Sequence, residues 1–312
     1  MTRRELIAVS GGALCAAAAA PIPIIDTHIH LFDPTRPQGI PWPPKTNEKL
    51  YKPALPERYR KLTAGLGIKG AIKVEASPWL EDNQWVLDVA AKDTIIVGVV
   101  GNLEAGKPDF RKNLDRFAKN KLFLGIRYGN LWDRKFSADV QRPEFIADIK
   151  ALAAAGLTMD TANPNPALIA DLVKLTNKVP ELRLVIDHLP QLNPPTEAAA
   201  KKAYEADLRE LGKNPKVFVK ISEVLRRVDG KVPLDMPFYR ERIDSLVGVF
   251  GEDRVLFGSD WPNSDNWADY PQVLAVVREY FTAKGQTAAE KYFWKNSKAA
   301  YRWTKRDPGQ PG

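Results

Sequence analysis

The three histidines of this 312-residue chain stand in patterns that could support catalysis. His28 and His30 are two positions apart in an apolar segment, and His188 directly follows Asp187. In a β-strand, residues i and i+2 point the same way, so the first two imidazoles would lie side by side. Paired neutral imidazoles suit a divalent metal such as zinc, which a carboxylate commonly completes. The pair predicts a metal or catalytic site, with two structural histidines as the alternative.

A carboxylate near the end of the chain is the predicted partner of these histidines. Asp260 lies in the segment Gly258–Pro262, which also follows an apolar run. Its carboxylate is expected to project toward His28 and His30, although an aspartate here could also cap the next helix. His188 belongs to the same group of strand ends, and we expect it to take part in catalysis rather than serve as a core histidine.

Further polar residues follow other apolar runs. Arg127 is a candidate anchor for a substrate carboxylate, because its planar guanidinium binds two oxygens at once. Glu75 and Lys220 could line the site or pair with each other inside the fold. The remaining candidates for substrate binding are Tyr128, Ser222 and Tyr51.

Eight apolar, β-branched runs bounded by turn residues are predicted to be strands. They are Ile22–His30, Gly70–Ser77, Thr94–Leu103, Leu122–Gly129, Gly156–Asn163, Leu182–His188, Val217–Ser222 and Val255–Pro262. Helical patterns lie between most of them, so we expect a parallel sheet covered by helices, closed into a (β/α)₈ TIM barrel. An open doubly wound sheet is the competitor, but no G-x-G-x-x-G follows the first strand. In a TIM barrel the carboxyl ends of the strands carry the active site.

The predicted helices have apolar residues at helical spacing. They are Leu80–Lys92, Phe110–Asn120, Pro143–Ala155, Pro166–Asn177, Glu197–Leu211, Pro237–Phe250, Ala268–Lys284 and Ala288–Trp303. The aromatic residues of the last two are expected to cover the outer wall of the barrel. The first loop, from Leu31 to about Lys52, is rich in proline, and a loop of that length is predicted to cover the site or to pack as a structured arm.

Composition restricts the class of protein. The 46 Lys and Arg residues are mixed with 38 Asp and Glu residues along the chain, without a dense basic cluster, so a nucleic-acid partner is not expected. With 44% hydrophobic residues and a single cysteine, the chain is neither a disordered polypeptide nor a disulfide scaffold. We expect a small-molecule substrate, which the net charge of +8 could help to attract if it is anionic.

The first twenty residues have the pattern of a secretion signal. Arg3 and Arg4 precede an uncharged stretch, Ile7 to Ala20, that ends in a run of alanines. The arginine pair and the mild hydrophobicity favour the twin-arginine route, with an ordinary frayed terminus as the alternative. We therefore predict a signal peptide over residues 1–20 and a single barrel domain over 21–312. The mature protein would be periplasmic and free of the membrane, or cytoplasmic if the signal is not used; its oligomeric state, homo-oligomers included, is open.

Six segments together resemble the amidohydrolase superfamily. They are D-T-H-I-H-L-F-D-P at 26–34, V-E-A-S at 74–77, V-G-V-V-G-N-L at 97–103, G-I-R at 125–127, V-I-D-H-L at 185–189 and L-F-G-S-D-W-P at 256–262. The resemblance is to the branch that includes 2-pyrone-4,6-dicarboxylate lactonase and sugar-acid lactonases. It implies hydrolysis of a lactone or ester of a small carboxylate-bearing or sugar-acid substrate.

The resemblance also implies roles for individual residues. A metal would be held by His28, His30 and Asp260; Asp260 would act as general base, and His188 would polarise the carbonyl group. The fifth predicted strand has no histidine at its end, which leaves one divalent metal, zinc, with Glu75 as a further ligand candidate. Some members of this branch are thought to work without metal, so metal-independent catalysis stays open. The alternatives are a non-oxidative decarboxylase or hydratase of an unsaturated acid, and a ligand-binding barrel without catalysis.

Overall fold

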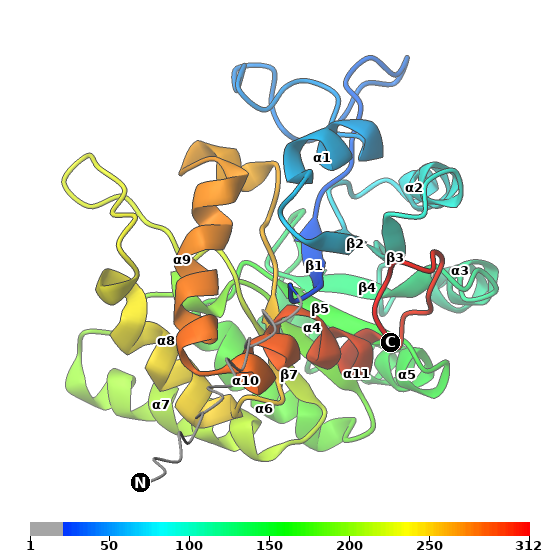
Figure 1. Ribbon diagram of the computed structural model, residues 1–312. Coiled ribbons are helices and arrows are strands. Elements are labelled where there is room, and N and C mark those ends of the chain that lie inside the picture. Colours follow the sequence, from blue (N-terminus) through cyan, green and yellow to red (C-terminus); the bar gives the residue numbers. More distant parts are fainter. Residues whose placement is uncertain (1–20) are drawn as a thin grey trace, which may run out of the picture.

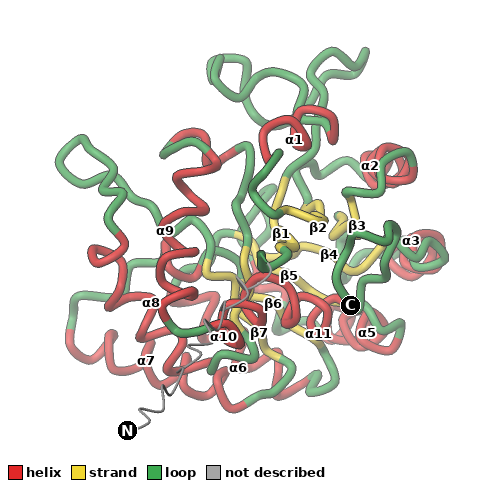
Figure 2. Tube along the Cα trace, viewed as in Figure 1, coloured by secondary structure: helices red, strands yellow, loops and turns green. Residues whose placement is uncertain are grey.

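The computed structural model describes residues 21–312, and its eight strands form one parallel sheet in sequence order. The strands are β1 (Ile24–Ile29), β2 (Ile68–Val74), β3 (Ile96–Gly101), β4 (Phe123–Gly129), β5 (Thr158–Ala162), β6 (Arg183–Ile186), β7 (Val217–Ile221) and β8 (Val255–Phe257). Figure 2 shows these strands at the centre of the molecule, surrounded by helices. The predicted signal peptide, residues 1–20, lies outside the described residues.

The two edges of the sheet meet at β1 and β8. Ile29 pairs with Trp261, the His30 N–H donates to the Trp261 carbonyl at 2.7 Å, and the Asp260 N–H donates to the His28 carbonyl at 2.8 Å. These bonds lie beyond the end of the three-residue strand β8, so loop residues complete the closure. The predicted (β/α)₈ barrel is confirmed.

Helices follow the strands and cover the outside of the barrel (Figure 1). They are α1 (Pro56–Thr63), α2 (Glu81–Ala91), α3 (Phe110–Phe117), α4 (Phe136–Asp139), α5 (Pro143–Ala154), α6 (Pro166–Lys178), α7 (Ala198–Lys213), α8 (Met236–Phe250), α9 (Tyr270–Ala283), α10 (Gln286–Glu290) and α11 (Asn296–Tyr301), with 3₁₀ turns η1 (Leu189–Gln191) and η2 (Asn263–Asn266) and a π-helical turn η3 (Lys291–Lys295). The short helices α1 and α4 were not predicted from sequence. No helix in the described residues is both long enough and apolar enough to cross a membrane.

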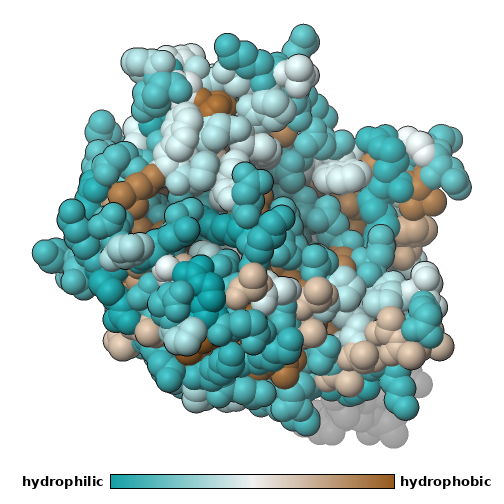
Figure 3. Space-filling model, turned by 180° about the vertical axis from the view of Figure 1, so that it is seen from behind, coloured by the Kyte–Doolittle hydropathy of each residue, from teal (hydrophilic) through white to brown (hydrophobic). Residues whose placement is uncertain are grey.

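The helices turn their apolar sides toward the strands. On the face shown in Figure 3 hydrophilic side chains dominate, and hydrophobic ones form small separate groups. Such a distribution is expected for amphipathic helices that cover a barrel.

The barrel interior contains its own apolar cluster. Side chains from seven of the eight strands contribute to it, among them Ile25 and Leu256, together with Tyr301 and Trp303 near the carboxyl end of the chain. The Tyr301 hydroxyl donates to Asp160 Oδ2 on β5 at 2.6 Å. The expectation that the late aromatic residues all cover the outer wall is therefore wrong for Tyr301, because α11 places this side chain among the residues of the interior cluster.

Asp26 joins the two edge strands to the helices outside them. Its buried carboxylate accepts hydrogen bonds from the Ser259 N–H at 2.8 Å and from the hydroxyls of Tyr59 and Tyr270, both at 2.9 Å. The His28 N–H donates to the same carboxylate at 3.1 Å. Tyr59 lies on α1 and Tyr270 on α9, so one side chain fixes the junction of four elements.

We predict that Asp26→Ala lowers the free energy of unfolding by about 3 kcal/mol, because it leaves several buried donors without an acceptor. Urea denaturation followed by circular dichroism measures the change. Asp115→Ala, at an exposed position on α3, is the control and should shift stability by less than about 0.5 kcal/mol. Equal stabilities of the two variants would contradict the role given to Asp26.

Candidate active site

All three histidines meet one oxygen atom of Asp260. Oδ1 of this carboxylate lies 3.0 Å from His30 Nε2, 3.4 Å from His28 Nε2 and 3.7 Å from His188 Nε2. The four side chains come from the ends of β1, β6 and β8 and are buried. The structure therefore brings together the four residues that the sequence singled out most strongly.

A cavity of about 290 Å³ opens beside these residues at the carboxyl ends of the strands. Its apolar wall is made by Trp42 from the first loop together with Ala76, Leu131 and Trp132. The other lining residues are polar: His30, Glu75, Arg127, Asn163, His188, Gln191, Glu223, Asp260 and Asn263. A cavity of this size and polarity suits a small, hydrogen-bonding molecule.

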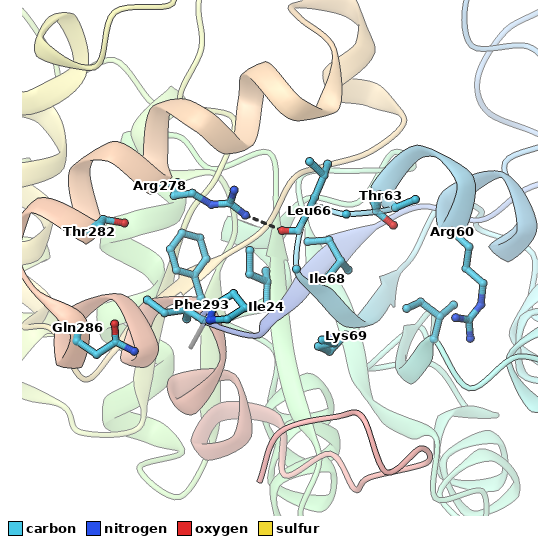
Figure 4. Close-up of a pocket in the computed structure, with 16 residues that line it drawn as sticks. Ile24, Arg60, Thr63, Leu66, Ile68, Lys69, Arg278, Thr282, Gln286 and Phe293 are labelled. Atoms are coloured by element: carbon cyan, nitrogen blue, oxygen red, sulfur yellow. Dashed lines mark hydrogen bonds between the residues drawn. The ribbon is translucent and has the colours of Figure 1, made fainter. Parts of the chain in front are cut away.

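A larger cavity, of about 670 Å³, lies at the other end of the barrel near the start of β1 and β2 (Figure 4). Two of its cationic groups have partners, because Arg60 pairs with Asp93 and Arg278 donates to the Leu66 carbonyl at 2.6 Å. Within the part of the chain that the structure describes, neither a histidine nor a carboxylate lines it. Since the larger cavity offers no acid–base pair, the smaller cavity is the candidate active site.

Five residues that line the smaller cavity have left-handed backbones: Trp132, in the loop after β4 with a φ of 57°, and four that follow strand ends closely. Asn163, His188, Glu223 and Asp260 have φ values of 47°, 50°, 47° and 61°, and each follows its strand, from β5 to β8, within three residues. This conformation costs a non-glycine residue on the order of 1 kcal/mol and persists where the surroundings hold it. The sharp turn at each strand end aims these side chains into the barrel mouth.

The donor set of His28, His30 and Asp260 fits a divalent metal. Their ligand atoms all lie within 4.8 Å of one another, and His28 Nε2 is buried without a hydrogen-bond partner. His30 Nδ1 lies 3.0 Å from the Val74 carbonyl and must donate to it, so in a neutral ring Nε2 presents a lone pair to Asp260. His30 Nε2 and Asp260 Oδ1 would then be two acceptors only 3.0 Å apart, and such a pair is stable only with a proton or a metal cation between the two atoms.

The ionisation of the site is set mainly by burial. Burial lowers the pKa of His28 well below its usual value and lowers the pKa of His188 to about 4, so both rings are neutral at pH 7. Burial opposes ionisation of Asp260 too, but the surrounding histidines, His188 first, hold the pKa of that carboxyl group well below its usual range. Neutral imidazoles and an ionised carboxylate are the forms that bind metal.

A buried network of charges lies behind His28. Lys220 Nζ is 2.7 Å from Asp160 Oδ2, 2.9 Å from Asp187 Oδ1 and 3.2 Å from His28 Nδ1. Sequence reasoning did not assign Asp160 or Asp187 to the site, although each is a charged residue in or beside an apolar strand. The suggested pairing of Lys220 with Glu75 is wrong, because Glu75 lies instead 3.4 Å from Arg134 Nη1.

Glu75 also stands apart from the metal-ligand group. It lines the cavity, but it is not among the side chains whose ligand atoms gather within 4.8 Å of one another. The expectation that it completes the metal site is therefore corrected. Burial raises the pKa of this carboxyl group to about 7, despite the nearby charge of Arg134.

Of the four residues expected to bind substrate, only Arg127 lines the cavity. Its Nε donates to the Thr161 carbonyl and lies 3.0 Å from Asp187 Oδ2, so its charge is shared with a buried carboxylate. Tyr128 points away, because successive strand residues face opposite sides, and its hydroxyl donates to Asp139 at 2.8 Å.

The other two expected residues have different places. Ser222 Oγ lies 2.9 Å from His188 Nδ1, so it contacts the histidine rather than the cavity. Tyr51 is half-buried in the first loop and does not line the cavity, whereas Trp42 of the same loop does. Sequence reasoning assigned no role to Glu223, which follows the seventh predicted strand, and missed Asn263; placement close after β7 and after Asp260 is the signal that could have identified them.

A (β/α)₈ barrel with histidines on β1 and an aspartate after β8 is a hydrolase-type architecture, and the comparisons agree. Residues 25–303 match the Amidohydrolase family, and the chain belongs to it. An L-fucono-1,5-lactonase of Burkholderia ambifaria is 29% identical over 254 residues, which cover 80% of this chain and 85% of that protein.

Solved structures share the fold at lower sequence identity. An amidohydrolase from Burkholderia multivorans, crystallised with bound zinc, superposes with a TM-score of 0.77 at 22% identity, over 90% of this chain and all of that one. A putative 2-pyrone-4,6-dicarboxylic acid hydrolase from Pseudomonas putida gives 0.68 at 18% identity, over 91% and 98% of the two chains. These structures support the barrel architecture.

We predict that Glu75→Gln stabilises the protein at alkaline pH. The folded carboxyl group keeps its proton to about pH 7, while the unfolded group releases it near 4.5, so the wild type loses stability as pH rises through this window. The loss is up to about 3 kcal/mol. Thermal unfolding at pH 5, 6, 7 and 8 should show a Tm advantage of the variant that grows with pH. Glu48→Gln, at an exposed position, is the control; a Tm advantage independent of pH would contradict the prediction.

Proposed function

We propose that this protein hydrolyses a lactone of a small sugar acid. The observation that carries the proposal is the meeting of His28, His30 and His188 around the Asp260 carboxylate at the wall of a polar cavity. The likeness to an L-fucono-1,5-lactonase supports a lactone as the substrate.

The charges of the cavity favour a neutral, hydroxyl-rich lactone over one that carries a carboxylate. Among residues 21–312, Arg127 is the only Lys or Arg that lines it, and this guanidinium already lies 3.0 Å from Asp187. Three carboxyl groups, those of Glu75, Glu223 and Asp260, line the same space. The carboxylate of a charged substrate would therefore find no unpaired cationic side chain among the described residues of the cavity. The hydroxyl groups of a neutral lactone, in contrast, could form hydrogen bonds with the amide and carboxyl groups that line it.

Asp260 is the proposed general base. As a buried anion it can accept a proton from the water that attacks the carbonyl carbon, and it can return that proton to the ring oxygen as the ester bond breaks. Its second oxygen, Oδ2, accepts a hydrogen bond from Asn263 Nδ2 at 2.6 Å. This bond holds the carboxylate so that Oδ1 faces the histidines.

His188 is the proposed hydrogen-bond donor to the carbonyl oxygen. The ring is neutral, so only one of its nitrogens carries a proton. If the Ser222 hydroxyl donates to Nδ1 across their 2.9 Å separation, the proton resides on Nε2, which lies near Asp260 at the cavity. An N–H at that point stabilises the negative charge that develops on the carbonyl oxygen. Ser222 thus positions the catalytic histidine.

A single divalent ion, zinc by its preference for nitrogen and oxygen ligands, would be held by His28, His30 and Asp260. When bound, such an ion acts as a Lewis acid toward water and carbonyl groups. Lys220 and Asp187 would orient the His28 ring from behind, and the Val74 carbonyl would orient the His30 ring.

We predict that Asp260→Asn lowers kcat for lactone hydrolysis by about 10²- to 10⁴-fold, since the amide cannot accept the proton. A pH-indicator assay with sugar-acid 1,5-lactones measures it, and circular dichroism verifies the fold. Asp265→Asn, five residues further along and outside the cavity lining, should hydrolyse at the wild-type rate. Unchanged turnover of Asp260→Asn would exclude it as the base. Product analysis that found carbon dioxide or a hydrated double bond would favour the decarboxylase or hydratase alternative.

We predict that the purified protein binds one equivalent of zinc and that His30→Gln weakens binding by about tenfold or more. Equilibrium dialysis with elemental analysis measures the affinity independently of activity. His188→Gln is the control, because its side chain lies outside the proposed ligand set. If protein that has been stripped of metal with a chelator still hydrolyses lactones at the full rate, catalysis by Asp260 and the histidines alone would be established instead.

The remaining proposals concern the export of the protein, its mature domain and its partners. We propose export through a twin-arginine signal over residues 1–20, with residues 21–312 as the single mature domain, and a small-molecule substrate without a nucleic-acid partner. The mixed distribution of charges along the chain supports the last point.

A further inference from the structure

Glu223 lines the active-site cavity with a backbone conformation that is unfavourable for a residue other than glycine. It follows β7 by two residues, its φ is 47°, and its side chain is only 6% exposed. Glycine is the residue best suited to a left-handed backbone, and a buried carboxyl group carries a further desolvation cost. A residue kept at such a position, with its side chain in the cavity, is a candidate for a direct role.

One oxygen of Glu223 is occupied and the other is not. Oε1 accepts a hydrogen bond from Asn263 Nδ2 at 3.0 Å, and the same nitrogen donates to Asp260. Oε2 lies 3.7 Å from His188 Nδ1, which is already 2.9 Å from the Ser222 hydroxyl. No Lys or Arg nitrogen of the described residues lies within 4.0 Å of the carboxyl group. Among the described residues, no N–H or O–H group donates a hydrogen bond to Oε2, which lies beside His188 and Asp260.

We propose that Glu223 is a specificity-determining residue whose free carboxyl oxygen binds a substrate hydroxyl group close to the reacting carbonyl. The inference rests on the proposed function, since the substrate must place its carbonyl between His188 and Asp260. Asn263 links Glu223 to Asp260, so the two carboxyl groups have a fixed spacing. A lactone with a hydroxyl group on a neighbouring ring carbon can then engage both.

The chemistry of the carboxyl group fits a hydroxyl ligand. In either ionisation state, a carboxyl group can accept a hydrogen bond that a substrate hydroxyl group donates. A substrate without the hydroxyl would leave the buried oxygen unpaired, and such a mismatch discriminates strongly between related substrates.

The test compares L-fucono-1,5-lactone with δ-valerolactone, which has the same six-membered ring without hydroxyl groups. We expect Glu223→Gly to lower the ratio of the two kcat/KM values by about 10- to 100-fold. Glu223→Gln, which keeps a donor and an acceptor, should lower it several times less. The Tm of Glu223→Gly should equal or exceed that of the wild type, because glycine relieves the left-handed backbone.

Asp229→Gly is the matched control. Asp229 has nearly the same φ, 48°, in an exposed turn outside the cavity, so its replacement should leave the ratio of kcat/KM values unchanged. A ratio for Glu223→Gly within twofold of the wild type would overturn the proposal and leave Glu223 as a support for Asn263.

A binding measurement separates this inference from the proposed function. Titration calorimetry with D-gluconolactam and δ-valerolactam, which resist hydrolysis, reports affinity whether or not the protein turns over lactones. Preference of the wild type for the hydroxylated lactam, reduced about tenfold or more in Glu223→Gly, supports the inference even if no lactone is hydrolysed. Equal affinity of the wild type for both lactams, or binding of neither, overturns it.

Discussion

The closure of the barrel between β1 and β8 is the constraint on which the site depends. Residues more than 200 positions apart become neighbours there, through the Asp260 N–H bond to the His28 carbonyl and the contacts of the Asp26 carboxylate. Because β8 is short, the closure is made largely by loop residues and by one buried side chain. The backbone bonds that close the sheet are the same ones that place Asp260, the proposed base, beside His28 and His30.

Burial then decides the protonation states of the site. Removing His28 and His188 from water lowers their pKa values and keeps them neutral, while the surrounding histidines hold the pKa of Asp260 low. Behind them, Lys220 lies between Asp160 and Asp187, so buried positive and negative charges compensate each other. In a low-dielectric interior, such fixed charges orient the reacting groups without reorganisation during the reaction.

The cavity separates two roles by position. Asp260 and His188 line the part of the cavity where we propose that the carbonyl group is attacked, and Glu223, linked to Asp260 through Asn263, lies beside them, where we propose that a hydroxyl group is recognised. Left-handed turns after β5 to β8 give four side chains access to the cavity. The scaffold is thus shared with other amidohydrolases, and the residues at the ends of these turns are the ones that can change the substrate.

The sequence by itself determined the barrel and its four central residues, because strand periodicity and the i, i+2 spacing of His28 and His30 are local properties. It could not separate Arg127 from Tyr128, which depends on which face of β4 turns inward, nor remove Glu75 from the metal ligands. Only the tertiary structure gave Lys220 its partners on β5 and after β6 and brought Glu223 and Asp260 together through Asn263. Those facts follow from distances between residues remote in the chain, which no local pattern encodes.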